Sequence, residues 1–144
     1  MKVKDILDSK GRKIFSVAEN DTVDHVVTAL ATNKVGFLVV QNSSGNVVGV
    51  ISERDVVHRC MNLKQDPRLL KASEIMTPKA NLHTASESDD IESIMTTMTE
   101  KKIRHLPIFQ GEQMVGLISI GDVIKFILQE KNDEIKSLMD YVSR

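Results

Sequence analysis

A duplicated segment constrains this chain more than any other feature. Residues 49–55 read Gly-Val-Ile-Ser-Glu-Arg-Asp, and residues 116–122 read Gly-Leu-Ile-Ser-Ile-Gly-Asp, 67 residues later. An upstream apolar series recurs at a spacing of 68, because the turn at 41–46 is one residue longer than its counterpart at 109–113. Only two such copies are present, and solenoid repeats are shorter and more numerous. We therefore expect two pseudosymmetric halves.

Hydrophobic periodicity predicts the same elements in each half. An apolar series at 23–31 has the spacing of an amphipathic helix, and Asp21 with Asp24 resembles a capping signal at its start. Asp89 and Glu92 repeat that signal in the second half. A hairpin of two largely buried strands is predicted after each helix. Its strands are 37–40 with 47–51, and 106–109 with 114–118.

A second helix is predicted to begin at the serine of each repeated motif. It would bury four apolar residues per half, namely Val56, Val57, Cys60 and Met61, matched by Val123, Ile124, Ile127 and Leu128. Each half is then strand, helix, strand, strand, helix, an α/β (α+β) arrangement. The apolar faces need cover, so we expect the halves to pack sheet against sheet in one module.

The domain boundaries follow from the repeat. We expect residues 1–65 and 66–131 to form the two repeats, followed by a helical extension at 132–144. That extension carries an apolar face at Ile135, Leu138, Met139 and Val142, beyond a polar break at 130–134. An extra helix of this kind is expected to pack on a neighbouring subunit.

Composition narrows the class of protein. Basic and acidic residues number 19 and 20 and are well mixed, which disfavours nucleic-acid binding and a polybasic membrane anchor. No apolar run is long enough to span a bilayer, and no secretory apolar segment follows Met1, so we expect a cytoplasmic protein. The single cysteine, Cys60, supports neither an intramolecular disulfide nor a zinc site.

The order of elements, with Gly-x-x-Ser-x-x-Asp at the last strand-to-helix junction of both halves, resembles the CBS domain. Short lead-ins at 3–6 and 73–76 precede the repeats, and Met-Thr-Pro at 76–78 is typical of the family. The chain resembles a stand-alone tandem pair, or Bateman module, of bacterial type. The resemblance implies a cleft between the halves that binds a regulatory adenosine-containing ligand, such as AMP, ATP, NAD(H) or S-adenosylmethionine. Among these ligands we expect AMP. The resemblance also implies a homodimer.

Ser52 with Asp55, and Ser119 with Asp122, allow two interpretations. In one, each serine caps a helix and the aspartate three residues later completes a capping box. In the other, which the resemblance favours, each aspartate accepts hydrogen bonds from both ribose hydroxyls and each serine lies where helix N–H groups meet phosphate. The two can coexist, because a helix start can be capped until an anion arrives.

Basic residues before the second hairpin are the candidate phosphate ligands. The resemblance makes Arg104 and His105 the strongest, and they align with the uncharged Gly36 and Phe37 in the first repeat. Both residues also have a structural interpretation, in which Arg104 is a solvated surface charge and His105 is a partly buried histidine that pairs with a backbone carbonyl. Two weaker phosphate candidates are Lys34 and Arg54. The asymmetry favours one better site, built around Asp122.

The base-binding candidates are weaker. The resemblance places Ile14, Leu82 and Thr84 at first-strand positions that contact the base in the family, and Gly36 would permit close approach of its backbone. The alternative is that Ile14 and Leu82 are simply core residues.

The leading hypothesis is a nucleotide sensor that has no catalytic residues and is read by an effector protein. A ligand-independent dimerisation module, S-adenosylmethionine binding, nucleic-acid binding through 101–105, and a cryptic enzyme are the alternatives. The histidines lack a metal-binding spacing, so we expect no metal and no catalytic cofactor; they are His25, His58, His83 and His105.

Overall fold

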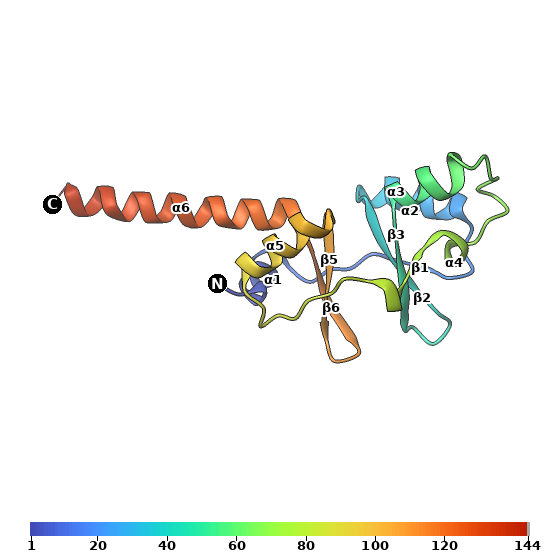
Figure 1. Ribbon diagram of the computed structural model, residues 1–144, viewed down its shortest axis with the longest axis horizontal. Coiled ribbons are helices and arrows are strands. Elements are labelled where there is room, and N and C mark those ends of the chain that lie inside the picture. The colour runs from blue at the N-terminus through green and yellow to red at the C-terminus, as the bar shows by residue number, and fades with distance from the viewer. Residues whose placement is uncertain (144) are drawn as a thin grey trace. The chain divides into compact units, whose positions relative to one another are not determined.

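The computed structural model describes residues 1–143, which divide into two compact units (Figure 1). Unit 1 combines Met1–Arg12 with the chain from Thr84 onward, and unit 2 is Lys13–His83. Both units are mixed α and β, and each holds its own sheet and buried core, in agreement with the predicted fold class.

Unit 2 is built on a four-stranded sheet in the order β1-β2-β3-β4. β1 pairs parallel to β2, and β2, β3 and β4 pair antiparallel in turn. Its core joins apolar residues of the sheet to those of the helices, among them Val26, Leu38 and Ile51. The elements of unit 2 are β1 (Ser16–Ala18), α2 (Val23–Asn33), β2 (Phe37–Gln41), β3 (Val47–Ser52), α3 (Glu53–Val56), η1 (Val57–Met61), α4 (Ala72–Ile75), β4 (Thr77–Pro78) and η2 (Lys79–Asn81).

Unit 1 is built on the hairpin of β5 and β6, which pair antiparallel. Ala85 forms an isolated parallel bridge with Ile108, in the place that β1 takes beside β2 in unit 2. The core joins Leu7, Met98 and Ile118 among others. The elements of unit 1 are α1 (Val3–Lys10), α5 (Ile91–Lys101), β5 (His105–Gln110), β6 (Gln113–Ser119) and α6 (Ile120–Val142).

The predicted capping signal of the first helix in each repeat is misplaced. α2 begins after Thr22, whose hydroxyl accepts a backbone N–H of the first turn at 3.1 Å. Asp21 instead accepts the N–H of Ala18 at 2.8 Å, and Asp89 accepts that of Ser86 at 2.9 Å. Short acidic side chains hold turns as readily as helix starts, and spacing alone does not separate the two roles.

The lead-in of each repeat packs in the compact unit of the other. α1 precedes the first repeat and belongs to unit 1, whereas α4 and β4 precede the second hairpin and belong to unit 2. The lead-ins pack closely against two glycines. A Cβ at Gly116 would lie 2.7 Å from Leu7 of α1, and a Cβ at Gly49 would lie 2.5 Å from the carbonyl oxygen of Thr77 in β4. The compact units therefore differ from the sequence blocks 1–65 and 66–131.

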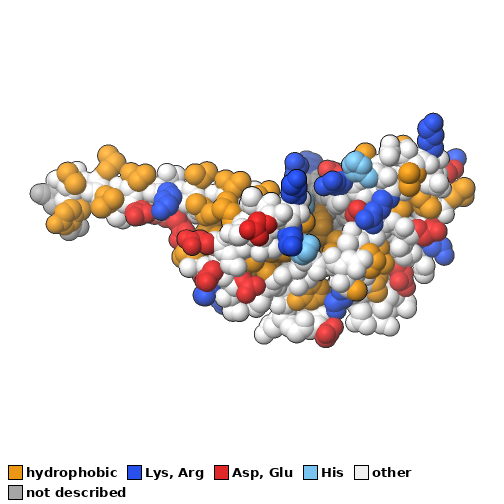
Figure 2. Space-filling view, in the orientation of Figure 1, with side chains coloured by type: hydrophobic (Ala, Val, Ile, Leu, Met, Phe, Trp, Pro, Cys, Tyr) orange, Lys and Arg blue, Asp and Glu red, His pale blue; other side chains and the backbone are white. Residues whose placement is uncertain are grey.

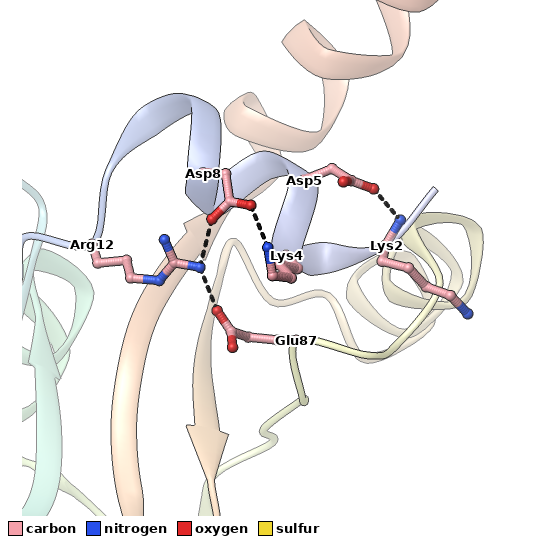
Figure 3. Close-up of polar contacts among 6 residues, drawn as sticks. All are labelled: Lys2, Lys4, Asp5, Asp8, Arg12 and Glu87. Atoms are coloured by element: carbon pink, nitrogen blue, oxygen red, sulfur yellow. Dashed lines mark hydrogen bonds and ion pairs between the residues drawn. The ribbon is translucent and has the colours of Figure 1, made fainter.

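Polar contacts fasten α1 within unit 1 (Figure 3). Asp8 accepts from Lys4 Nζ at 2.7 Å and from Arg12 Nη2 at 2.8 Å, and Arg12 also donates to Glu87. The hydrogen bonds from Lys4 and then Arg12 lower the pKa of the Asp8 carboxyl. The backbone N–H of Lys4 donates to the carbonyl of Glu87 at 3.0 Å, which adds a link that pH does not affect.

The second helix of each repeat buries only part of its predicted stripe. Val56 and Cys60 are buried in unit 2, but Val57 and Met61 are 54% and 57% exposed. In unit 1, Val123 is buried and Ile127 packs against the core, whereas Ile124 and Leu128 are exposed. The eight residues do recur at matched positions, but each apolar stripe is wider than the surface that the unit offers to cover it.

The expected extra helix at the C-terminus is not a separate helix. α6 runs without interruption from Ile120 to Val142, so the extension at 132–144 is the second half of one helix, with Arg144 outside the described residues. The segment contains neither glycine nor proline, and polar residues are compatible with an exposed helix. No helix within residues 1–143 combines the length and apolar character needed to cross a membrane.

Candidate ligand-binding site

The Ser-x-x-Asp motif of unit 1 forms a complete capping box at the start of α6. The Ser119 hydroxyl accepts the N–H of Asp122 at 3.1 Å, and Asp122 Oδ2 accepts the N–H of Ser119 at 2.9 Å. Both the helix N-terminus and the adjacent carboxylate are thereby fixed in position. The side chain of Asp122 remains 24% exposed, so solvent reaches the carboxylate.

Unit 2 repeats this arrangement at α3. The N–H of Asp55 donates to the Ser52 hydroxyl at 3.2 Å, and Asp55 Oδ2 accepts the N–H of Ser52 at 2.9 Å. A cation approaches less closely here, because Arg59 Nε lies 3.8 Å from Asp55 Oδ1. The capping interpretation is confirmed in both repeats, while the ribose interpretation stays a prediction.

A lysine that the sequence did not point to lies against Asp122. Lys10, at the end of α1, places Nζ 2.6 Å from Asp122 Oδ2 and 2.9 Å from the carbonyl oxygen of Leu117. It lies 112 residues from Asp122 in the sequence, so neither spacing nor pattern signals the contact. Only the exchange of lead-ins brings the two together. Unit 1 thus gains a cation beside its carboxylate.

The pKa of Asp122 reflects this environment. Burial alone would raise the pKa of the carboxyl, but hydrogen bonds from Lys10 and from the backbone of Ser119 outweigh it, and the pKa is lowered. The carboxylate therefore keeps its negative charge at neutral pH, as a strong acceptor for neutral hydroxyl groups.

The lowered pKa predicts an acid-dependent term in stability. The folded chain binds a proton at Asp122 less readily than the unfolded chain, where the pKa is about 3.9. The ionised carboxylate makes its full contribution to the free energy of unfolding above that value, and the contribution is lost as the pH falls through the pKa of the folded chain. Asp122→Asn should therefore flatten part of the dependence of urea unfolding on pH between about 5 and 2.5. An acid dependence equal to that of the wild-type chain would contradict the assignment.

The predicted phosphate ligands of unit 1 lie at the same helix start. His105 pairs with Ser119 across the β5–β6 hairpin, and the Arg104 carbonyl accepts the N–H of Ile120 at 2.8 Å. The side chain of Arg104 is exposed and that of His105 is half-buried. Backbone pairing therefore brings both residues to the beginning of α6, next to Asp122.

Unit 2 has the same backbone arrangement without the basic side chains. Phe37 pairs with Ser52, and the carbonyl of Gly36 accepts the N–H of Glu53 at 3.0 Å. A Cβ on Gly36 would lie 3.3 Å from the carboxylate carbon of Glu53, a flexible side chain that can move aside. The packing around position 36 therefore favours glycine only mildly.

The weaker candidates are more scattered. Lys34 is the left-handed C-cap of α2, with φ 54°, and Arg54 is an exposed residue of α3. Ile14 and Leu82 are half-buried residues of unit 2, and Thr84 is an exposed residue at the beginning of the second segment of unit 1. Contacts of these residues with a base stay predictions.

Two further observations concern the cysteine and the metal-ligating side chains. Cys60 is buried, and burial raises the pKa of its thiol, which disfavours the reactive thiolate. Among residues 1–143 no three His, Cys, Asp or Glu side chains are grouped to hold a metal ion.

Comparison with known proteins places these features in a family. Residues 3–62 and 72–129 each match the family model of the CBS domain, so this chain belongs to the CBS-domain family and carries two CBS domains in tandem. Tandem CBS modules are regulatory and generally not catalytic.

Relatives and solved structures agree with that assignment. The CBS domain-containing protein CBSX3, mitochondrial, of Arabidopsis thaliana is 29% identical over 97% of this chain and 71% of its own length. The structure of a protein with CBS domains from Burkholderia ambifaria superposes with a TM-score of 0.83, at 32% identity over 90% of this chain and 95% of that one. CBS domain protein PAE2072 of Pyrobaculum aerophilum, solved in complex with AMP, gives a TM-score of 0.73 at 27% identity over 85% and 89% of the two chains.

Proposed function

We propose that this chain is a regulatory module that binds AMP at the start of α6 in unit 1. The observation that carries the proposal is the fixed, ionised carboxylate of Asp122, which lies beside a helix N-terminus and a lysine. The AMP complex of the Pyrobaculum aerophilum relative supports the choice of ligand.

The ribose and the phosphate of AMP each have a chemical counterpart at this site. Asp122 would accept hydrogen bonds from the ribose hydroxyls, mainly through Oδ1, since Oδ2 is already used by Ser119 and Lys10. The phosphate would lie toward the positive end of α6, a helix long enough to have a full dipole, with Arg104 and His105 as side-chain ligands. Ser119 would meet the phosphate through its hydroxyl, because its N–H already donates to Asp122.

Lys10 would set the balance between ligands. A ribose that binds Asp122 must share its carboxylate with the lysine, which weakens binding of an uncharged nucleoside. The same cation favours a ligand that carries phosphate. We therefore place AMP above adenosine and above S-adenosylmethionine, whose sulfonium is positive, and keep ATP and NAD(H) as further candidates.

The output of the module would be a change in packing that another protein reads. A ligand shifts an equilibrium only through different affinities for the two states, and a ligand at this site touches α6, α1 and the β5–β6 hairpin together. We propose a homodimer and an effector protein as the partners of the module.

A thermal-shift panel tests the proposal directly. A ligand that binds only the folded chain adds about 2.7 kcal/mol at a hundredfold excess over its Kd, which raises Tm by roughly 5–10 °C for a chain of this size. AMP should give the largest rise among AMP, ATP, NADH, S-adenosylmethionine and adenosine. The absence of a shift with every ligand would overturn the proposal and favour a ligand-independent dimerisation module.

A further inference from the structure

The two motif sites differ in charge at matched positions. Overall charge does not separate them, since the chain has 19 basic and 20 acidic residues and Figure 2 shows both kinds interspersed over the face drawn. The difference is local. In unit 1 the hairpin is preceded by Arg104, and α6 begins with Ile120. In unit 2 the matched residues are Gly36 and Glu53, so a carboxylate is present where unit 1 has a guanidinium.

The carboxylate of Glu53 lies where a side chain of residue 36 would begin. A Cβ on Gly36 would be 3.3 Å from both Cδ and Oε2 of Glu53, and 3.7 Å from Oε1. The N–H of Glu53 donates to the carbonyl of Gly36 at 3.0 Å. The matching bond in unit 1 runs from Ile120 to Arg104 at 2.8 Å, so the two backbones agree here. Glu53 therefore holds a negative charge beside the place from which the Arg104 side chain starts in unit 1.

Glu53 also offsets the basic residue that follows it. Arg54 is the weaker phosphate candidate of unit 2, and both side chains are exposed at the start of α3. Within residues 1–143 the Glu53 carboxylate accepts no hydrogen bond and forms no ion pair, so no fixed partner neutralises its charge. Unit 1 has the uncharged Ile120 and Gly121 at the matched positions. A phosphate at the start of α3 would meet a carboxylate that has no counterpart at the start of α6.

We propose that Glu53 is a specificity-determining residue that excludes phosphate from the motif site of unit 2. This role rests on the proposed function, in which the motif aspartates accept ribose hydroxyls. Asp55 keeps that acceptor, because Arg59 Nε comes no closer than 3.8 Å to its Oδ1. Unit 2 would therefore prefer a ribonucleoside that carries no phosphate, while unit 1 takes AMP. The chain would then bind one AMP tightly although it contains the motif twice.

An NMR titration of the full chain measures the two sites separately. The backbone N–H signals of Gly36 and Arg54 report on unit 2, and that of Gly121 reports on unit 1. Glu53→Gln should strengthen AMP binding at unit 2 about tenfold, the repulsion expected between one carboxylate and a doubly charged phosphate about 6 Å away in water. Adenosine has no phosphate and should bind unit 2 equally well in both chains. Because Glu53 is exposed, we expect the variant to fold normally.

Two further variants separate charge from other effects. Glu53→Asp keeps the charge and should leave AMP binding at unit 2 within about twofold of wild type, a change of about 0.4 kcal/mol. Glu100→Gln removes an exposed carboxylate from α5 and should leave unit 2 unchanged. If Glu53→Gln brings no gain at Gly36 and Arg54, the role of Glu53 is overturned, even where Gly121 responds to AMP. If Gly121 does not respond in any chain, the proposed function fails, and the signals of unit 2 still decide the role of Glu53.

Discussion

Asp122→Asn should weaken AMP binding about a hundredfold, because it replaces a charged acceptor of two ribose hydroxyls, and hydrogen bonds to charged groups contribute about 1.5–3 kcal/mol each. The asparagine oxygen can still accept the N–H of Ser119, so the start of α6 stays capped. Titration calorimetry measures the loss, and a cooperative urea transition with the slope of the wild-type chain would show that the fold is intact.

Asp55→Asn is the matched control in unit 2. Asp55 has the same capping box, but its repeat has Gly36 and Phe37 where unit 1 has Arg104 and His105. We therefore expect a smaller effect on AMP affinity than at Asp122. Equal losses at the two positions would contradict the preference for unit 1, and full affinity in Asp122→Asn would contradict the site itself.

Gly49→Ala should destabilise the chain by about 2–3 kcal/mol, the upper range for forcing a group into a packed interior. A Cβ there would lie 2.5 Å from the carbonyl oxygen of Thr77 and 2.7 Å from Met76 Sδ. The carbonyl belongs to β4, which is paired with β3, so it cannot move aside without breaking the sheet edge. Urea unfolding measures the cost as a shift in midpoint at a constant slope.

Two other glycines separate this steric clash from the general effect of adding a methyl group. Gly121→Ala lies in the first turn of α6, where the nearest atom to the new Cβ, Ser119 Oγ, is 3.6 Å away, and it should be neutral or stabilising by up to about 1 kcal/mol. Gly116→Ala places its Cβ 2.7 Å from a methyl carbon of the buried Leu7, a side chain and not a paired backbone carbonyl, and should fall between the two. A Gly49→Ala chain as stable as Gly121→Ala would show that β4 does not hold its position against β3.

Local features of the fold could be predicted from the sequence. The hairpins at 37–52 and 105–119 follow from β-rich runs around polar turns, and the caps at Ser52 and Ser119 follow from a four-residue motif. In each case the residues that interact are close in sequence, so the pattern carries the information.

Non-local features could not be predicted. The stripe through Val57 and Met61 has helical spacing, but periodicity does not say how much of an apolar face its own unit will cover. Lys10 belongs to a segment whose partner lies more than a hundred residues away, and no local rule links it to Asp122. The sequence therefore indicated the motif residues of the candidate site but gave no signal for Lys10, which the structure places against the carboxylate of Asp122.

The exchange of lead-ins has a mechanical consequence. The chain leaves unit 1 after Arg12, passes through unit 2, and returns at Thr84, so two covalent tethers join the units in place of the single linker of an ordinary two-domain protein. One tether begins two residues after Lys10, which contacts Asp122. A ligand that draws Lys10 away from that carboxylate would act on the end of α1, from which the first tether leads to β1.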